Sequence, residues 1–188
     1  LLFLCITFIN KLNFSNKLID WYNSNKRDLP WRRTKDPYKI WVSEIILQQT
    51  RIEQGEKYYH KFLNKYPNIT SLSNTNNNEL LKIWEGLGYY SRALNMLKTA
   101  IIVVDKYQGI FPSTYNELIG LPGIGDYTAS AISSICKNEV QPVVDGNVLR
   151  FLSRLYKVDL AIDSVKTKKY FKNLGFQLIK DVNPGDFN

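Results

Sequence analysis

Two carboxylates stand in surroundings that favour opposite protonation states. Glu44 lies in WVSEIILQQT, residues 41 to 50, on an expected helix face that it shares with apolar side chains, where the ionised form is disfavoured. Asp145 lies in VVDGNVLRFLSRLY, just before another expected helix, where free N–H groups and the helix dipole stabilise an anion. An acid and an anion together can cleave a glycosidic bond, because the acid protonates the leaving group while the anion stabilises an oxocarbenium-like centre.

Each carboxylate also has a purely structural interpretation. Glu44 can be a buried glutamate paired with a structural Arg or Lys. Asp145 can be an N-cap, which is compatible with a catalytic role because the same helix end keeps it ionised. The helix after Asp145 is expected to bury a stripe made of Val148, Phe151, Leu152 and Leu155. Both interpretations stay open at this point.

The stretch LPGIGDYTASAI, residues 121 to 132, predicts a phosphate-binding turn. Gly123 and Gly125 allow close backbone approach, and the following helix directs free N–H groups outward. That helix is expected to bury Tyr127, Ala131 and Ile135 against a preceding helix that contains Tyr115, Leu118 and Ile119. This is the helix-hairpin-helix pattern, which holds a DNA backbone without reading bases; an ordinary joint between two helices is the alternative.

Composition indicates one domain, or two lobes that share a core. The 188 residues are 44% hydrophobic, and 25 Lys and Arg against 17 Asp and Glu give a net charge of +8. Such a balance is typical of a protein that meets a polyanion, although a soluble protein from a lysine-rich proteome would show it too. Cys5 and Cys136 provide neither a disulfide framework nor a zinc site, so a reducing cytoplasm is expected.

The first 13 residues are interpreted as an apolar leader, buried or vestigial. The segment LLFLCITFI is too short for a membrane span of about 20 residues, and no basic segment precedes it. Because the chain begins without Met, a cut-off signal sequence is the alternative.

The remaining chain reads as a succession of helices, and the expected fold class is all-α without repeats. Asp36-Pro37 is a cap followed by proline that opens a helix to about Gln49. Further helices are expected near 14–26, 52–65, 78–85, 89–107, 114–120, 126–137, 146–157 and 164–181. Residues 140 to 144 are expected to form an extended connector because Pro142 interrupts them. The Asn-rich run 74–78 is expected to be a solvated loop with a capping Asn.

Five motifs occur in one order: LPWR (29–32), DPYKIWVSEIILQQT (36–50), WEGLGYYSRA (84–93), LPGIGDYTASAI (121–132) and VVDGNVLR (143–150). Over residues 14 to 188 the chain resembles the MutY-type adenine DNA glycosylases of the helix-hairpin-helix/Gly-Pro-Asp superfamily. The resemblance implies an all-α, two-lobed fold, with a six-helix module over about 36–144 and an incomplete second lobe from about 14–35 plus 145–188. It also implies base-excision repair, in which adenine mispaired with 8-oxoguanine or guanine is flipped from the duplex and removed.

The resemblance also implies roles for single residues. Glu44 matches the acid that protonates adenine at N7, and Asp145 matches the carboxylate that stabilises the sugar carbon C1′. Tyr127 and Asn147 match polar residues near that carbon, Gln49 and Tyr89 match residues wedged into the base stack, and Trp31 and Arg32 match positions of the base pocket. Thr50 completes a Gln-Gln-Thr run that favours the adenine enzymes over the endonuclease III branch, and Leu121 belongs to the DNA-binding turn with Gly123 and Gly125. Taken alone, Tyr89 and Tyr90 would more often be core aromatics than wedges.

Tyr127 stands where relatives that also cut the DNA backbone carry Lys. Without that amine no Schiff base can form, so a monofunctional hydrolase is expected. Thymine-mismatch glycosylases share the Tyr and Asp positions and, with endonuclease III-like enzymes, remain the enzymatic alternatives.

The family's [4Fe–4S] cluster requires four closely spaced cysteines, which the resemblance places after residue 188. No cofactor is therefore expected from this chain, which looks cut short before a final helix. The absent helix is expected to leave apolar surface uncovered near Phe171, Leu174, Phe176, Leu178 and Ile179. A truncated, inactive DNA-binding remnant is thus a further alternative. The expected partner is double-stranded DNA with a mispaired adenine, bound by a monomer in a bacterial-type cytoplasm at the nucleoid, with no membrane association.

Overall fold

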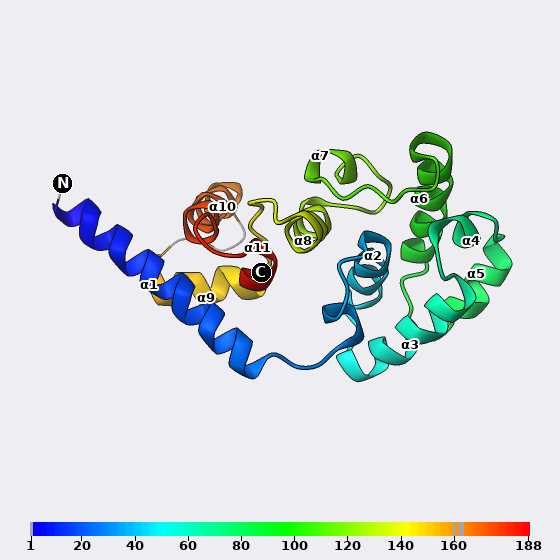
Figure 1. Ribbon diagram of the computed structural model, residues 1–188, viewed down its shortest axis with the longest axis horizontal. Coiled ribbons are helices and arrows are strands. Elements are labelled where there is room, and N and C mark those ends of the chain that lie inside the picture. The colour runs from blue at the N-terminus through cyan, green and yellow to red at the C-terminus, as the bar shows by residue number, and fades with distance from the viewer. Residues whose placement is uncertain (1, 160, 162–163) are drawn as a thin grey trace. The chain divides into compact units, whose positions relative to one another are not determined.

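The computed structural model describes the backbone of residues 2–159, 161 and 164–188, and the side chains of the same set from residue 14 onward. The secondary-structure elements of this part of the chain are all helices, with no strand among them, which confirms the all-α prediction (Figure 1). The elements in order are α1 (Leu2–Asn25), η1 (Pro30–Arg32), α2 (Pro37–Ile46), α3 (Ile52–Lys65), α4 (Ile69–Ser73), α5 (Asn77–Trp84), α6 (Ser91–Tyr107), α7 (Tyr115–Leu118), α8 (Asp126–Lys137), α9 (Gly146–Tyr156), α10 (Val165–Ile179) and α11 (Pro184–Phe187).

Most of the long helices begin and end close to their predicted positions. The largest difference lies in α1, which begins at Leu2 instead of near residue 14, and a smaller one lies in α2. Helix α2 begins at Pro37 as predicted, with Asp36 accepting from the backbone N–H of Tyr38 at 3.0 Å. It ends at Ile46 instead of about Gln49, because Gln49 has a φ of 58° and so leaves the right-handed helical region. The Asn-rich run caps α5 through Asn76, as expected. Three short elements were not predicted: η1, α4 and α11.

The chain divides into two compact units. Unit 1 contains Leu1–Arg27 and Ser133–Asn188, and unit 2 contains Asp28–Ile132. The sequence-based division had its boundaries near 35/36 and 144/145. The N-terminal segment continues without a break as α1, whereas the side chains of the proposed leader, residues 1–13, lie outside the described set.

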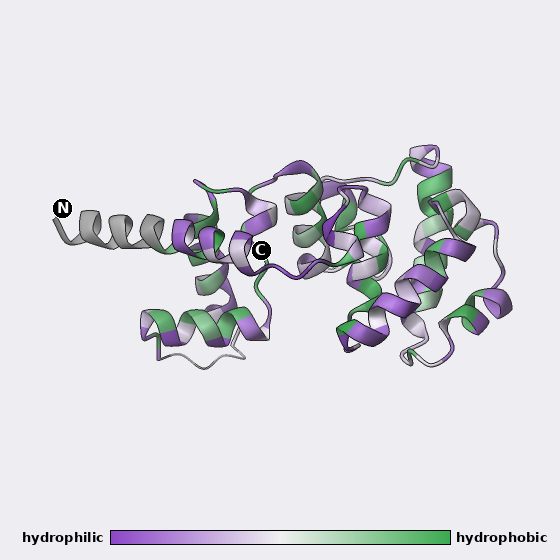
Figure 2. Ribbon diagram, turned by 60° about the horizontal axis from the view of Figure 1, so that its bottom comes forward, coloured by the Kyte–Doolittle hydropathy of each residue, from purple (hydrophilic) through white to green (hydrophobic). Residues whose placement is uncertain are grey.

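Unit 2 is built on aromatic side chains. Trp41 on α2, Phe62 on α3 and Trp84 on α5 are almost fully buried, and α4 and α5 both pack on α6. Tyr38 reaches across this core and donates its hydroxyl to the carbonyl of Tyr66 at 2.8 Å. Many helices carry apolar residues along one side and hydrophilic residues along the other (Figure 2), which is the pattern that directs one face of each helix into a core.

Unit 1 has a smaller core between α9 and α10. Its buried members are Leu149, Leu152, Phe171, Leu174 and Leu178. The predicted stripe on α9 is partly wrong, because Phe151 and Leu155 are 49% and 45% exposed and Leu149 is buried in their place. The buried face of α9 is therefore rotated relative to the predicted one.

The expected exposure on α10 is wrong for four of the five residues named. Phe171, Leu174, Leu178 and Ile179 are buried, whereas Phe176 is exposed, at 36%. The reason is that α10 packs on α1 as well as on α9, and α1 also contacts α11. The hydroxyl of Ser15 on α1 donates to the carbonyl of Leu178 at 2.7 Å, which fixes this contact.

The last residues fasten the connector that leads to Asp145. The amide of Asn188 donates to Ser134 Oγ and to the carbonyl of Gln141, both at 2.9 Å, and accepts from the backbone N–H of Val143 at 3.0 Å. The connector is extended, as predicted. The carbonyl of Gln141 and the N–H of Val143 are thus satisfied by a side chain rather than by a strand partner.

Within the described part of the chain, no helix is both long enough and apolar enough to cross a membrane.

Replacing Phe171 with Ala tests the unit 1 core. Phe171 is fully buried, and removing such a side chain lowers the free energy of unfolding by about 3–5 kcal/mol. The neighbouring Tyr170 is 45% exposed, so Tyr170→Ala is the matched control and should cost far less. Urea unfolding followed by circular dichroism measures both variants, and equal losses would contradict the description of this core.

Candidate functional site

Glu44 lies on α2 in an apolar environment, without a charged partner among the described residues. Its side chain is partly buried, whereas its helix neighbours Trp41 and Ile45 are buried almost completely. Within the part of the chain that the structure describes, the Glu44 carboxyl forms no ion pair or hydrogen bond, so the interpretation as a buried Glu paired with Arg or Lys finds no support. Burial raises the pKa of Glu44 from its ordinary value of 4.5 to about 7. The group is therefore an acid that loses its proton near neutral pH rather than near pH 4.5.

Asp145 has the opposite environment, at the N-terminus of α9. Its Oδ1 accepts from the backbone N–H groups of Asn147 at 2.9 Å and Val148 at 2.8 Å. Its Oδ2 accepts from the Asn147 side-chain amide at 3.1 Å, and Arg150 in turn donates to Asn147 Oδ1 at 2.6 Å. The N-cap interpretation is confirmed. Each of the three N–H donors needs a lone pair on a carboxyl oxygen, so the cap uses Asp145 as a hydrogen-bond acceptor.

The turn at 121–125 joins two helices, α7 and α8, as the hairpin prediction requires. Gly123 has a φ of +76°, which favours glycine. Gly123 and Gly125 are exposed, and neither N–H donates to any acceptor among the described residues. The Tyr115 hydroxyl donates to Asp126 Oδ1 at 2.7 Å, closing the hairpin, and this bond raises the pKa of Tyr115 to about 12. The turn thus presents free main-chain donors that suit an anion.

Tyr127, the second residue of α8, was predicted to be buried and is instead 41% exposed. The buried face of α8 contains Ala131, as predicted, together with Thr128 and Ile132, while Leu121 is buried at the start of the turn. The aromatic ring of Tyr127 is therefore available at the surface of the hairpin.

Two further predicted residues lie at sharp turns of the chain, which we call corners: one follows α2, and the other precedes α6. Gln49 follows the end of α2 and is exposed with a φ of 58°, and Tyr89 precedes α6 with a φ of 45° and 65% exposure. The alternative that Tyr89 and Tyr90 are core aromatics is wrong, because Tyr90 is 45% exposed as well. Thr50, the residue after Gln49, donates its backbone N–H to the carbonyl of Leu47 at 3.2 Å.

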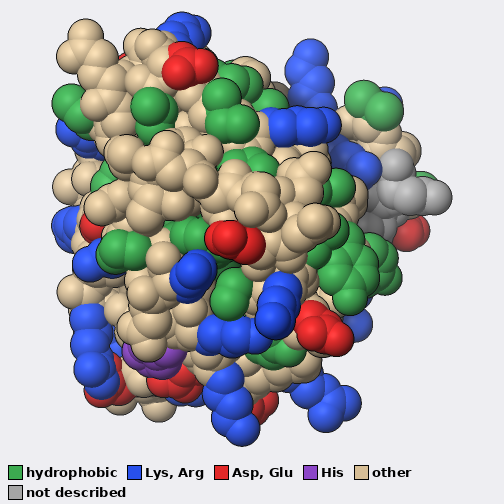
Figure 3. Space-filling model, turned by 90° about the vertical axis from the view of Figure 1, so that its right-hand side faces the viewer, with side chains coloured by type: hydrophobic (Ala, Val, Ile, Leu, Met, Phe, Trp, Pro, Cys, Tyr) green, Lys and Arg blue, Asp and Glu red, His purple; other side chains and the backbone are tan. Residues whose placement is uncertain are grey.

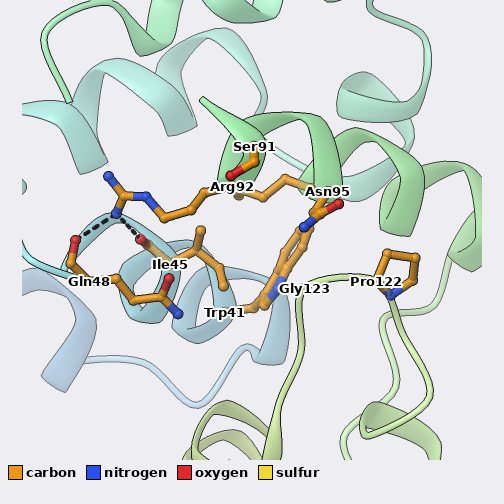
Figure 4. A pocket seen from close by; sticks show the side chains of 9 residues that line it. Trp41, Ile45, Gln48, Ser91, Arg92, Asn95, Pro122 and Gly123 are labelled. Atoms are coloured by element: carbon orange, nitrogen blue, oxygen red, sulfur yellow. Dashed lines mark hydrogen bonds between the residues drawn. The ribbon is translucent and has the colours of Figure 1, made fainter. Parts of the chain in front are cut away.

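Arg92, which was not among the predicted site residues, joins these two corners. Its Nη1 donates to the carbonyls of Ile45 at 2.8 Å and Gln48 at 2.7 Å (Figure 4). Its Nη2 donates to the carbonyls of Leu87 at 3.0 Å and Gly88 at 3.3 Å. No local signal distinguishes it from a surface arginine near a helix start.

A cavity of about 140 Å³ lies where α2, α6 and the glycine turn meet. Its lining includes Trp41, Gln48, Arg92, Asn95 and Gly123, drawn in Figure 4. A Cβ added at Gly123 would lie 2.9 Å from Asn95 Cβ, so the turn packs directly on α6. Thr99 strengthens this contact by donating to the carbonyl of Pro122 at 2.9 Å.

Trp31 and Arg32 lie in η1 and do not line that cavity. Trp31 is nearly buried, with its ring edge-to-face against Tyr59 at a centroid distance of 5.4 Å. Arg32 is exposed.

The two units differ in charge. Unit 1 contains 13 Lys and Arg against 7 Asp and Glu, a net of +6, whereas unit 2 contains 12 against 10, a net of +2. On the face drawn in Figure 3, the described Lys and Arg side chains are interspersed with acidic and apolar ones rather than gathered in one patch. Most of the excess positive charge thus belongs to unit 1.

The residues at hand do not fit an iron–sulfur cluster. Such a cluster takes four cysteine thiolates, and the 188 residues contain two. Among the described residues, no group of three His, Cys, Asp or Glu side chains is arranged to hold a metal ion.

Known proteins resemble this chain along almost all of it. It is 41% identical to an adenine DNA glycosylase from Buchnera aphidicola subsp. Acyrthosiphon pisum, over 96% of this chain and 52% of that protein. The adenine DNA glycosylase of Homo sapiens is 39% identical, over 93% of this chain and 34% of that protein. The chain thus spans about half the length of the bacterial relative.

Solved structures agree at the level of the fold. A thermostable thymine-DNA glycosylase superposes with a TM-score of 0.82 at 28% identity, over 96% of this chain and 85% of that one. A trapped covalent intermediate of endonuclease III with DNA superposes with a TM-score of 0.72 at 20% identity, over 92% and 81%.

A sequence profile for HhH-GPD superfamily base excision DNA repair proteins matches residues 42–175. This range includes Glu44, the hairpin of α7 and α8, and Asp145 at its cap. By sequence and by fold, the chain belongs to the HhH-GPD superfamily of base excision DNA repair proteins.

Proposed function

We propose that this chain is the catalytic region of an adenine DNA glycosylase, which hydrolyses the N-glycosidic bond of adenine mispaired with 8-oxoguanine or guanine. The observation that carries the proposal is the unpaired carboxyl of Glu44, whose burial raises its pKa to about 7. Adenine leaves a sugar readily only when its ring is protonated, so an acid whose pKa lies near the working pH matches the chemistry. Identities near 40% to adenine DNA glycosylases support the choice of base.

The reaction divides between the two carboxylates. Glu44 donates its proton to N7 of the flipped adenine, and the electron pair of the C1′–N9 bond departs with the base. The carboxylate of Asp145, held by its cap donors, stabilises the positive charge at C1′. Water then bonds to C1′, and the proton that it releases restores the acid form of Glu44. Tyr127 and Asn147 act as polar neighbours of C1′, with no amine at position 127 to form a Schiff base.

Three features of the chain would bind DNA: main-chain N–H groups, positive charge and two exposed side chains. The free N–H groups of Gly123 and Gly125 bind backbone phosphate without reading sequence. The net charge of +6 on unit 1 adds long-range attraction. Gln49 and Tyr89 project as side chains able to fill the space left by an extruded base, since unstacking needs a replacement surface.

The substitution Glu44→Gln tests the acid. We expect wild-type protein to convert a duplex carrying adenine opposite 8-oxoguanine to abasic product in single-turnover assays, and the variant to be slower by about 10²–10⁴-fold. Glu53 is exposed on α3, so Glu53→Gln is the matched control and should retain the wild-type rate. Thymine opposite guanine and an oxidised pyrimidine complete the substrate panel. Preferential release of either base would favour the thymine-mismatch or endonuclease III-like alternative, and no release from any duplex would favour an inactive DNA-binding remnant.

The pH dependence should follow Glu44. Since the acid form is required and its pKa is about 7, the single-turnover rate should be high below pH 7 and fall about tenfold per pH unit above it.

Folding stability provides a readout that needs no DNA. The folded pKa lies above the ordinary value of 4.5, so below about pH 4.5 both the folded and unfolded states are protonated. As pH rises to about 7 the unfolded state alone releases its proton, and wild type loses stability relative to Glu44→Gln. Urea unfolding of both proteins from pH 4 to 8 measures this difference. A difference that stays constant over that range would show that Glu44 has an ordinary pKa.

Salt and the glycine turn should affect DNA binding in separable ways. Counterion release makes the dissociation constant rise steeply with salt. Gly123 has a φ of +76°, and a Cβ there would crowd Asn95, so Gly123→Ala should distort the turn. Because the amides of the turn are uncharged, the variant should bind DNA more weakly at every salt concentration, with the same dependence of the dissociation constant on salt. A Cβ at Gly120 meets nothing within 4 Å, so Gly120→Ala is the control. Fluorescence anisotropy measures these constants, and salt-insensitive binding would count against the electrostatic part of the proposal.

A further inference from the structure

The guanidinium of Arg92 connects two corners of unit 2 that are distant in sequence. One is the end of α2, whose carbonyls of Ile45 and Gln48 accept from Nη1; the other is the glycine loop before α6, whose carbonyls of Leu87 and Gly88 accept from Nη2. Helix ends and tight loops leave such carbonyls without backbone partners. A single planar group satisfies both sets, so neither corner can move without losing bonds to Arg92.

Each corner has an exposed side chain on a residue whose backbone is in an unfavourable conformation. Gln49 has a φ of 58° and Tyr89 a φ of 45°, and residues with a Cβ rarely adopt this left-handed region. Tyr89 directly follows Gly88, and Gln49 directly follows Gln48, and the carbonyls of Gly88 and Gln48 both accept from Arg92. The contacts of Arg92 therefore act directly beside the two unfavourable residues.

The surroundings of Arg92 show that its charge is directed inward. Its guanidinium lies 5.3 Å from the ring of Trp84 and 5.7 Å from that of Tyr89. Trp84 also donates its Nε1–H to the carbonyl of Gly88 at 3.1 Å, which holds the same loop. Since both Nη atoms are bound to main-chain carbonyls, Arg92 is not placed as a phosphate-binding cation. A lysine has one nitrogen and cannot donate to both corners in this geometry.

We propose that Arg92 is a positioning residue that fixes Gln49 and Tyr89 as a pair, set at one spacing for insertion where an extruded nucleotide leaves the base stack. The inference rests on the proposed function and deepens it, because it names the group that prepares the insertion before DNA binds. Arg92 itself contacts no substrate. Its contribution is to hold two unfavourable corners ready, so that DNA binding does not have to order them.

The first test uses protein without DNA. Amide hydrogen exchange of wild type, Arg92→Lys and Arg92→Met should show exchange at least about tenfold faster at both corners, residues 47–50 and 86–90, in each variant. Lys98 is exposed on the same helix, so Lys98→Met is the control and should leave both corners unchanged. Arg92→Lys retains the charge and most of the side chain, which keeps the test valid where Arg92→Met is unstable. Unchanged exchange at both corners in Arg92→Lys would overturn the proposal.

The second test measures insertion. A duplex with 2-aminopurine next to the mispaired adenine becomes fluorescent when the stack opens, and Arg92→Lys should reduce this rise at saturating protein. In a background of Gln49→Ala and Tyr89→Ala, the further change Arg92→Lys should have little added effect, because Arg92 acts through those side chains. A wild-type rise that Arg92→Lys retains would overturn this inference alone. No rise with wild type would overturn the proposed insertion, while the exchange data still decide whether Arg92 orders the corners.

Discussion

An unpaired carboxyl on a largely buried helix is the constraint on which the site depends. Placing Glu44 beside Trp41 and Ile45 costs free energy unless the group keeps its proton, and the fold provides no cation to reduce that cost among the described residues. The consequence is a pKa of about 7. A Lys or Arg partner would reduce the cost of burying Glu44, but it would also lower the pKa of the carboxyl and favour the ionised form. The apolar neighbours are thus part of the acid's chemistry as well as part of the core.

The same functional group is treated in the opposite way at Asp145. There the N-terminus of α9 and the amide of Asn147 provide three N–H donors, and Asn188 fastens the preceding connector through Val143. One carboxyl is deprived of hydrogen bonds and the other is saturated with them. Local environment thus gives the two carboxyls different hydrogen bonding.

Helix α6 holds three other segments of unit 2 in place. Arg92, Asn95 and Thr99 follow one another at intervals of three and four residues, so they share a helix face. Arg92 holds the end of α2 and the glycine loop, while Asn95 and Thr99 contact the glycine turn. Three segments that the proposed function brings to DNA are therefore attached to one rigid element. Sites supported in this way keep their geometry before the ligand arrives.

Residue types and local spacing determined the helical class, the caps at Asp36, Asn76 and Asp145, and the glycine turn. They also made Glu44 a candidate acid, with pairing to an Arg or Lys as the open alternative. Each of these features depends on groups within about four residues of one another, such as a side-chain oxygen and the N–H two or three positions later. Such bonds can be inferred from sequence because chain connectivity already brings the partners together.

Tertiary structure alone decided the exposure of Tyr89 and Tyr127, the rotation of the buried face of α9, and the coverage of Phe171. An aromatic residue at helical spacing suits a core and a surface equally well, and only packing against other elements distinguishes them. Arg92 is the clearest case, because its acceptors on α2 and beyond lie 44 to 47 residues away along the chain. No local pattern specifies a bond of that range; it exists because folding brings the end of α2 against the start of α6.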